Sequence, residues 1–118
     1  SLFQPTLVGG GLGAPQIPVD LPTFDEVVGP TVAAQDFNAF ILERFSPEKL
    51  NVYAIHAEVE GILMANDFRQ LLADARQRDI HFQPLGDLLS AAPDALATGR
   101  VVRGTLEGRE GWLGVQGA

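Results

Sequence analysis

The segment 51–61 carries three ionisable side chains, His56, Glu58 and Glu60, at alternate positions. An apolar run over 52–55 precedes them and predicts a buried strand that delivers His56 at its end. In extended backbone alternate side chains share a face, so all three groups would point the same way. If the chain turned helical instead, His56 and Glu60 would still be neighbours at i and i+4. Either geometry places an imidazole among carboxylates just past a strand end, where α/β proteins place their sites.

An imidazole among carboxylates is suited to general acid catalysis. An acid that assists the departure of an amine must be protonated near neutral pH. Free imidazole has a pKa of ~6.5, and a nearby carboxylate favours its charged form. Glu58 and Glu60 could provide that charge, orient His56 or hold a polar substrate. The structural alternatives are a histidine that only satisfies the fold and two glutamates in a solvated loop.

The composition limits the classes of function. The chain has 118 residues, which fits one small domain or a piece of a larger one, and no cysteine, which excludes disulfides and thiolate metal sites. Fifteen acidic residues outnumber eight basic ones, and the net charge of −7 argues against a nucleic-acid partner. No apolar run is long enough to span a membrane. The chain does not begin with Met, so we expect it to begin within a longer protein.

The elements that must position these residues follow from apolar spacing. We expect a short irregular strand over 16–21, a capping box over Thr23–Glu26, a helix over 36–45, a strand over 52–55, a helix over 66–78, a strand over 80–83, a helix over 85–91 and a hairpin from residue 99 onward. The first long helix has an apolar face of Phe37, Phe40, Ile41 and Phe45, and the second has a stripe of Phe68, Leu71, Leu72 and Ala75. Helices alternating with strands predict parallel strands with crossover helices. A sheet of two or three parallel strands cannot bury both of its faces. The chain therefore has the pattern of half an α/β structure.

Four further residues are candidates with a structural alternative. Asp25 and Glu26 begin a helix, where acids favour the dipole, and Glu26 also fits the capping box with Thr23. Arg103 and Arg109 flank the expected hairpin turn, where they could meet a phosphate or be solvated.

Three ordered motifs resemble the C-terminal part of enzymes of the polysaccharide-deacetylase (NodB-homology) superfamily. They are QIPVDLPTFDEV at 16–27, VYAIHAEVEG at 52–61, and the tail pair VVRG at 101–104 and GREGWLG at 108–114. Within the superfamily they are similar to the deformylases that act on 4-deoxy-4-formamido-L-arabinose linked to undecaprenyl phosphate. The resemblance runs from about residue 10 to the end of the chain.

The resemblance implies an α/β fold that is the C-terminal portion of an irregular β/α barrel with a terminal β-hairpin. In such enzymes a divalent metal, held by an Asp and a His-x-x-x-His pair, activates water, a second Asp is the base, and a late His protonates the leaving nitrogen. Only the late His has a matching position here, which is His56. The family's metal ligands and base lie in the N-terminal half. We therefore expect residues 1–118 to be the C-terminal segment of the catalytic domain, without metal ligands and inactive alone.

The resemblance also implies a substrate and a place of action. The substrate would be a lipid-linked aminosugar, processed peripherally at the cytoplasmic face of the inner membrane in the lipid A modification that confers polymyxin resistance. Asp25 and Arg103 join Glu58 and Glu60 as candidates for binding it or for orienting His56. Two other functions remain open: a non-catalytic binding or interaction module, and a deacetylase for another acyl-amino sugar.

Overall fold

The protein is a small mixed α/β structure made of two compact units. The computed structural model describes residues 1–92 and 94–118. We call residues 19–82 the helical unit, and residues 1–18 together with 83–118 the sheet unit. Every candidate residue on the segment 51–61 lies in the helical unit.

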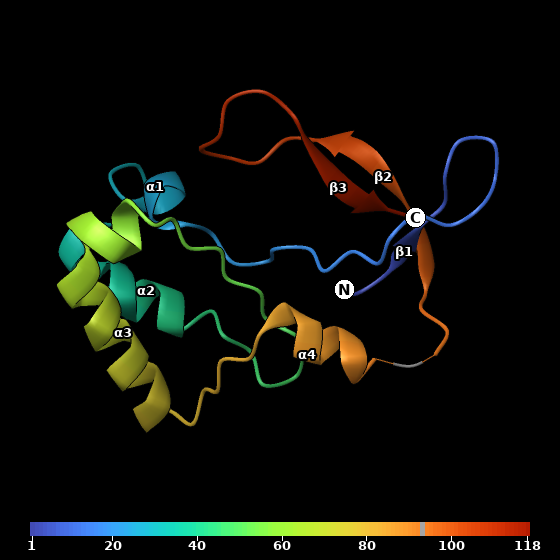
Figure 1. Cartoon of the computed structure of the whole chain (residues 1–118). Helices are drawn as coiled ribbons and strands as arrows, with labels where there is room; N and C mark the ends of the chain where they lie inside the picture. Colours follow the sequence, from blue (N-terminus) through green and yellow to red (C-terminus); the bar gives the residue numbers. More distant parts are fainter. Residues whose placement is uncertain (93) are drawn as a thin grey trace. The chain divides into compact units, whose positions relative to one another are not determined.

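The sheet unit holds an open, mixed, three-stranded sheet (Figure 1). Its strands are β1 Gln4–Pro5, β2 Thr98–Gly104 and β3 Leu113–Gly117, in the order β1-β2-β3. β1 is parallel to β2, whereas β2 and β3 are antiparallel, with Val102 opposite Val115. The predicted terminal hairpin is therefore confirmed. The short helix predicted at 85–91 is also present, as α4 Leu85–Ser90.

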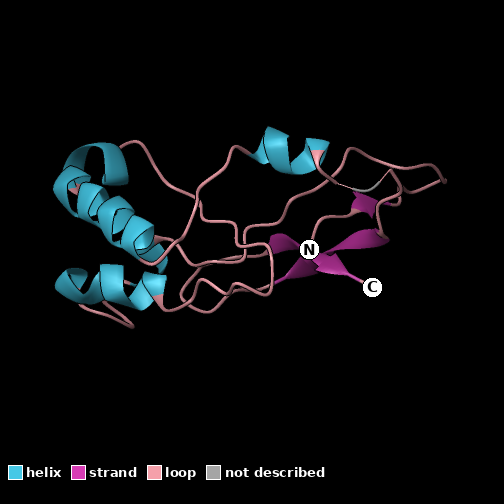
Figure 2. Ribbon diagram, turned by 90° about the horizontal axis from the view of Figure 1, so that it is seen from below, coloured by secondary structure: helices cyan, strands magenta, loops and turns pink. Residues whose placement is uncertain are grey.

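The helical unit contains four helices around one apolar cluster. They are α1 Phe24–Val27, α2 Phe37–Leu42, the π-helix η2 Val59–Leu63 and α3 Ala65–Gln77, and a 3₁₀ turn, η1 Ala34–Asp36, precedes α2. α2 and α3 pack side by side (Figure 1, Figure 2). The predicted helices at 36–45 and 66–78 are thus confirmed, although α2 ends three residues earlier than its apolar spacing predicts.

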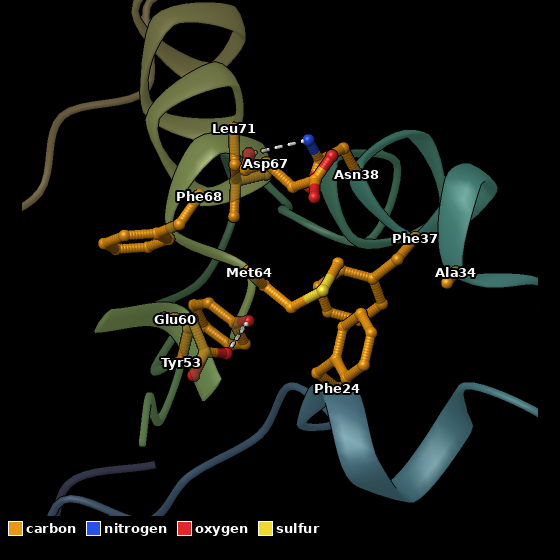
Figure 3. A pocket seen from close by; sticks show the side chains of 10 residues that line it. All are labelled: Phe24, Ala34, Phe37, Asn38, Tyr53, Glu60, Met64, Asp67, Phe68 and Leu71. Atoms are coloured by element: carbon orange, nitrogen blue, oxygen red, sulfur yellow. Dashed lines mark hydrogen bonds between the residues drawn. The ribbon is translucent and has the colours of Figure 1, made fainter. Parts of the chain in front are cut away.

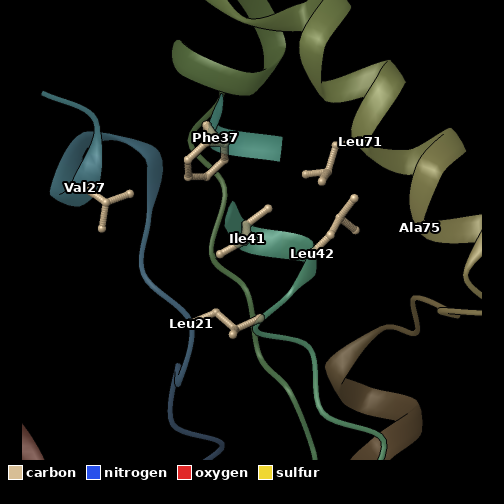
Figure 4. Packing of buried hydrophobic residues seen from close by; sticks show 7 residues of the cluster. All are labelled: Leu21, Val27, Phe37, Ile41, Leu42, Leu71 and Ala75. Atoms are coloured by element: carbon tan, nitrogen blue, oxygen red, sulfur yellow. The ribbon is translucent and has the colours of Figure 1, made fainter. Parts of the chain in front are cut away.

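The core of this unit is formed by side chains of α1, α2 and α3 and by Leu21, which precedes α1. Its buried members are Leu21, Val27, Phe37, Ile41, Leu42, Leu71 and Ala75 (Figure 4). Phe40, Phe45 and Phe68 are partly buried against this cluster. Leu72, which the spacing assigned to the core, is 39% exposed, so that assignment is wrong. One residue is 100° of rotation on a helix, which turns Leu72 away from the row formed by Leu71 and Ala75.

The irregular strand predicted over 16–21 is reduced to one bridge between Gln16 and Phe3, two further predicted strands are absent from the described residues, and the helix–strand alternation predicted for the middle of the chain is wrong. Residues 51–55 form no ladder, because the only described residues whose backbone pairs with theirs are Asp20 and Leu21. The amide nitrogens of those two residues lie 3.2 Å from the Val52 oxygen, and the Val52 amide donates to the Asp20 side chain at 2.6 Å. A strand needs continuous backbone pairing with a neighbour, which this segment lacks.

The second missing strand is the one predicted at 80–83. Its first residue, Ile80, belongs instead to the capping motif that follows α3. Asp79 has a positive φ of 60°, the left-handed conformation that ends many helices. The Ile80 amide then donates to the Ala75 oxygen at 2.9 Å, and the Asp79 amide to the Arg76 oxygen at 3.1 Å. This pair of bonds is a Schellman motif, and the Ile80 side chain packs on the core. The apolar residue that predicted a strand is therefore used to close a helix.

Candidate functional site

The chain turns sharply at His56. The amides of Val59 and Glu60 both donate to the His56 oxygen at 3.0 Å, which begins the turn that continues as η2. Of the two geometries that the spacing allowed, the structure has the turned one, in which His56 and Glu60 are neighbours at i and i+4. Glu58 shares that turn, but its side chain is exposed.

Glu60 is a buried carboxylate with two hydrogen-bond donors. It is 5% exposed, and its Oε2 accepts the His56 amide at 2.8 Å. Its Oε1 accepts the Tyr53 hydroxyl at 2.9 Å (Figure 3). Buried charges need such partners, because removal from water is costly. Glu60 therefore binds the backbone of His56, where sequence spacing had suggested contact with its ring.

The same contact perturbs Tyr53. Burial of the phenol, followed by its hydrogen bond to Glu60 and the negative charges of Glu60 and Asp25, raises the pKa of Tyr53 well above its ordinary value. Each of these effects disfavours the phenolate. Tyr53 is thus held as a neutral hydroxyl that can donate only to the carboxylate it faces.

The His56 ring is left accessible. Its side chain is 45% exposed, and its Nδ1 lies 4.0 Å from an Asp25 carboxylate oxygen. Asp25 sits in the first turn of α1, where the Thr23 amide donates to Glu26 at 3.0 Å. This bond confirms the predicted pairing of Thr23 with Glu26 across the capping box. It leaves Asp25 free of capping and on the side of α1 that approaches His56.

A small pocket lies against the Tyr53–Glu60 pair (Figure 3). It is lined by Phe24, Ala34, Phe37, Asn38, Tyr53, Glu60, Met64, Asp67, Phe68 and Leu71. Its cavity volume is about 10 Å³, which is room for about one water molecule and far below the roughly 300–1,000 Å³ of typical ligand sites. Glu60 therefore joins two features, since its carboxylate forms part of the pocket wall and also holds the backbone of His56.

Arg103 and His81 have contacts of their own. The Arg103 guanidinium stacks on the Trp112 ring, 4.3 Å from its centroid, in the sheet unit. The ring of His81, the second histidine, is exposed and lies 2.8 Å from Asp79. Among the described residues, the structure therefore brings together His56, Glu60 and Asp25, to which it adds Tyr53. Asp25 lies thirty-one positions before His56, and no local pattern shows that the two meet.

The described part of the chain offers no metal site and no membrane span. Across residues 1–92 and 94–118, no three His, Cys, Asp or Glu side chains are grouped so that they could hold a metal ion. None of the helices described there is long and apolar enough to cross a bilayer.

Comparison with known proteins shows what the chain is similar to. No family model matches it. A protein of Shewanella sediminis (strain HAW-EB3) is 43% identical over 117 residues, and one of Wigglesworthia glossinidia brevipalpis is 36% identical over 117 residues. Both are described as probable 4-deoxy-4-formamido-L-arabinose-phosphoundecaprenol deformylase ArnD. This chain is homologous to a segment of these deformylases.

The extent of the match confirms the resemblance predicted from the motifs. Each alignment covers 98% of this chain, so the similarity includes both units. The chain spans only 37% of the length of the Shewanella protein and 41% of the Wigglesworthia protein.

Proposed function

We propose that this chain is the C-terminal segment of a metal-dependent deformylase. The enzyme would hydrolyse the formamide of 4-deoxy-4-formamido-L-arabinose linked to undecaprenyl phosphate. The observation that carries the proposal is homology over 98% of the chain to deformylases described with that substrate. The exposed ring of His56, on a backbone fixed by Glu60, supports it independently.

His56 would be the general acid of the reaction. Water adds to the formyl carbon, and the C–N bond then breaks as the nitrogen takes a proton from the imidazolium, which leaves a free amine and formate. The Nδ1 atom of His56 faces Asp25, so Nε2 is the atom that gives the proton. Positioned proton transfer of this kind contributes roughly 10²–10⁴-fold to the rate.

Asp25 would act through His56. A carboxylate 4.0 Å from Nδ1 limits the rotation of the ring. Both side chains are partly exposed, so solvent screens the attraction, and orientation is the larger part of its effect.

The metal belongs to the rest of the domain in this proposal. The described residues do not form a site for it, so its ligands and the catalytic base would come from the N-terminal part of the deformylase. That part would also complete the irregular β/α barrel, by pairing with the open sheet and with the extended residues 51–55. The lipid-linked substrate implies peripheral action at the cytoplasmic face of the inner membrane, in the lipid A modification that confers polymyxin resistance.

Formate release from the lipid-linked formamido-sugar tests the proposal in the intact enzyme that carries this sequence. The His56→Ala substitution should lower turnover by roughly 10²–10⁴-fold. His81→Ala is the matched control, because it removes the second histidine of the chain, whose ring is exposed and contacts Asp79.

Two outcomes would contradict the proposal. Unchanged turnover in His56→Ala would remove His56 from the mechanism. Formate release by residues 1–118 alone would show that the remaining part of the domain is dispensable. An intact enzyme without any hydrolytic activity would favour the alternative of a binding or interaction module.

A further inference from the structure

We infer that Glu60 is a positioning residue, which fixes the catalytic acid through its backbone amide and is itself held by Tyr53. This inference rests on the proposed role of His56. It assigns Glu60 neither to proton transfer nor to substrate binding, and it adds Tyr53 to the residues on which the reaction depends. We call the Tyr53 hydroxyl, the Glu60 carboxylate and the His56 amide the clamp.

The geometry leaves Glu60 no free oxygen for substrate. Oε1 receives the Tyr53 hydroxyl at 2.9 Å and Oε2 receives the His56 amide at 2.8 Å. The residue is 5% exposed, so little of it is accessible to a substrate. The contact from the His56 amide is in the range of charge-assisted hydrogen bonds, and the contact from the Tyr53 hydroxyl is in the ordinary range of O–H···O bonds.

The clamp closes a ring around His56. The His56 amide binds the Glu60 side chain, while the His56 oxygen receives the amides of Val59 and Glu60 at 3.0 Å. Both backbone polar groups of His56 are therefore engaged by the turn that follows it. The imidazole is the part of the residue left accessible, since its side chain is 45% exposed.

A buried carboxylate is a costly way to hold a turn. An ionised group taken out of water needs full compensation, and an apolar residue of similar size is often as stable. Glu58, two residues earlier, shows that the same turn accepts an exposed glutamate. The buried charge at position 60 is explained if the direction of the His56 backbone matters for the reaction.

The clamp should therefore affect turnover more than substrate affinity. A displacement of about 1 Å in a catalytic group can cost roughly 10²-fold in rate. Loss of the clamp would shift His56 without removing any group that touches the substrate, so KM should stay within about twofold while kcat falls.

The experiment uses Glu60→Gln and Tyr53→Phe, with Glu48→Gln, at an exposed glutamate of the same unit, as the control. A glutamine at 60 removes the negative charge and puts an NH₂ donor in place of one acceptor oxygen, which weakens the hold on the His56 amide, whereas Tyr53→Phe removes only the hydroxyl and keeps the ring. In the intact enzyme we expect kcat to fall roughly 10–100-fold in Glu60→Gln and about 3–10-fold in Tyr53→Phe, with Glu48→Gln unchanged. Tyr53→Phe decides the question if Glu60→Gln does not fold.

A second readout does not depend on activity. In the ¹⁵N-labelled 118-residue chain, hydrogen exchange of the His56 amide should accelerate at least about tenfold in Glu60→Gln and stay unchanged in Glu48→Gln. Unchanged exchange, or wild-type kcat in both clamp variants, would overturn the inference. A rise in KM at constant kcat would do so as well, because it would mean that Glu60 binds substrate.

The two proposals can fail separately. If His56→Ala retains full activity, the proposed function of His56 is lost, yet amide exchange still reports whether the clamp exists. If His56→Ala is inactive while both clamp variants are normal, the acid stands and the clamp is refuted.

Discussion

Tyr53 offers a sensitive test of the geometry around His56, because it is the only tyrosine in the chain. Its phenol is desolvated and donates to the Glu60 carboxylate, and both effects raise its pKa above the ordinary value of 10.0. The ultraviolet absorbance of tyrosinate therefore reports this one side chain. In a pH titration of the folded chain, we expect that signal to appear only well above pH 10.

The same shift makes stability depend on pH. Between pH 10 and the raised pKa, the unfolded chain has lost the phenol proton while the folded chain keeps it, so the free energy of unfolding falls as pH rises. Below pH 10 both states are protonated and stability is at its full value. One pH unit above the unfolded pKa, the loss is about 1.4 kcal/mol.

Denaturant unfolding of the wild type and of Tyr53→Phe, compared at pH 9 and pH 11, measures this loss. The variant lacks the titrating group, so its stability should fall by about 1.4 kcal/mol less than that of the wild type over this interval. An absorbance transition near pH 10 in the folded chain would refute the reasoning, since it would mean that the phenol is neither desolvated nor bonded to Glu60. Equal pH dependence in both proteins would do the same.

Three further predictions concern stability at neutral pH. Leu71→Ala should lower the free energy of unfolding by about 2–5 kcal/mol, because Leu71 is 1% exposed. Leu72→Ala, at a 39% exposed position, should lower it far less. Similar losses for the two variants in urea unfolding would contradict the burial of Leu71 and the exposure of Leu72. His56→Ala should change stability by no more than about 0.5 kcal/mol, because the ring is 45% exposed and its ion pair is screened; a loss of several kcal/mol would make His56 structural. Asp79→Gly should raise the melting temperature, with a gain of about 0.5–1 kcal/mol, because glycine adopts the positive φ of this position without strain; a lower melting temperature would show that the exposed contact with His81 matters more.

The features that the sequence alone predicted are local ones. The pairing of Thr23 with Glu26, the long amphipathic helix α3 and the terminal hairpin each follow from residues a few positions apart. The resemblance to deformylases likewise came from short ordered motifs, and alignments that are 36% and 43% identical over 98% of the chain confirmed it.

The errors arose where a local pattern had two possible uses. The apolar residues at 52–55 have the composition of a strand, yet a strand forms only beside another, and the described residues supply two backbone partners there. Ile80 is also an apolar, β-branched residue, but Asp79 before it has a left-handed backbone conformation. Ile80 therefore belongs to the motif that ends α3, and its side chain packs on the core. Composition leaves open both whether such residues are buried and what they pack against, since Val52 is 8% exposed whereas Ile55 is 52% exposed.

His56 and its acidic surroundings were determined by the sequence, whereas the tertiary structure decided which acid does what. Glu60, chosen as a neighbour of the ring, holds the backbone instead, and Asp25, thirty-one positions away, faces the ring. Spacing specifies which side chains can share a turn, because backbone geometry repeats over a few residues. The approach of α1 to that turn depends on the packing of the core, and burial decides which carboxylate must be fully hydrogen-bonded.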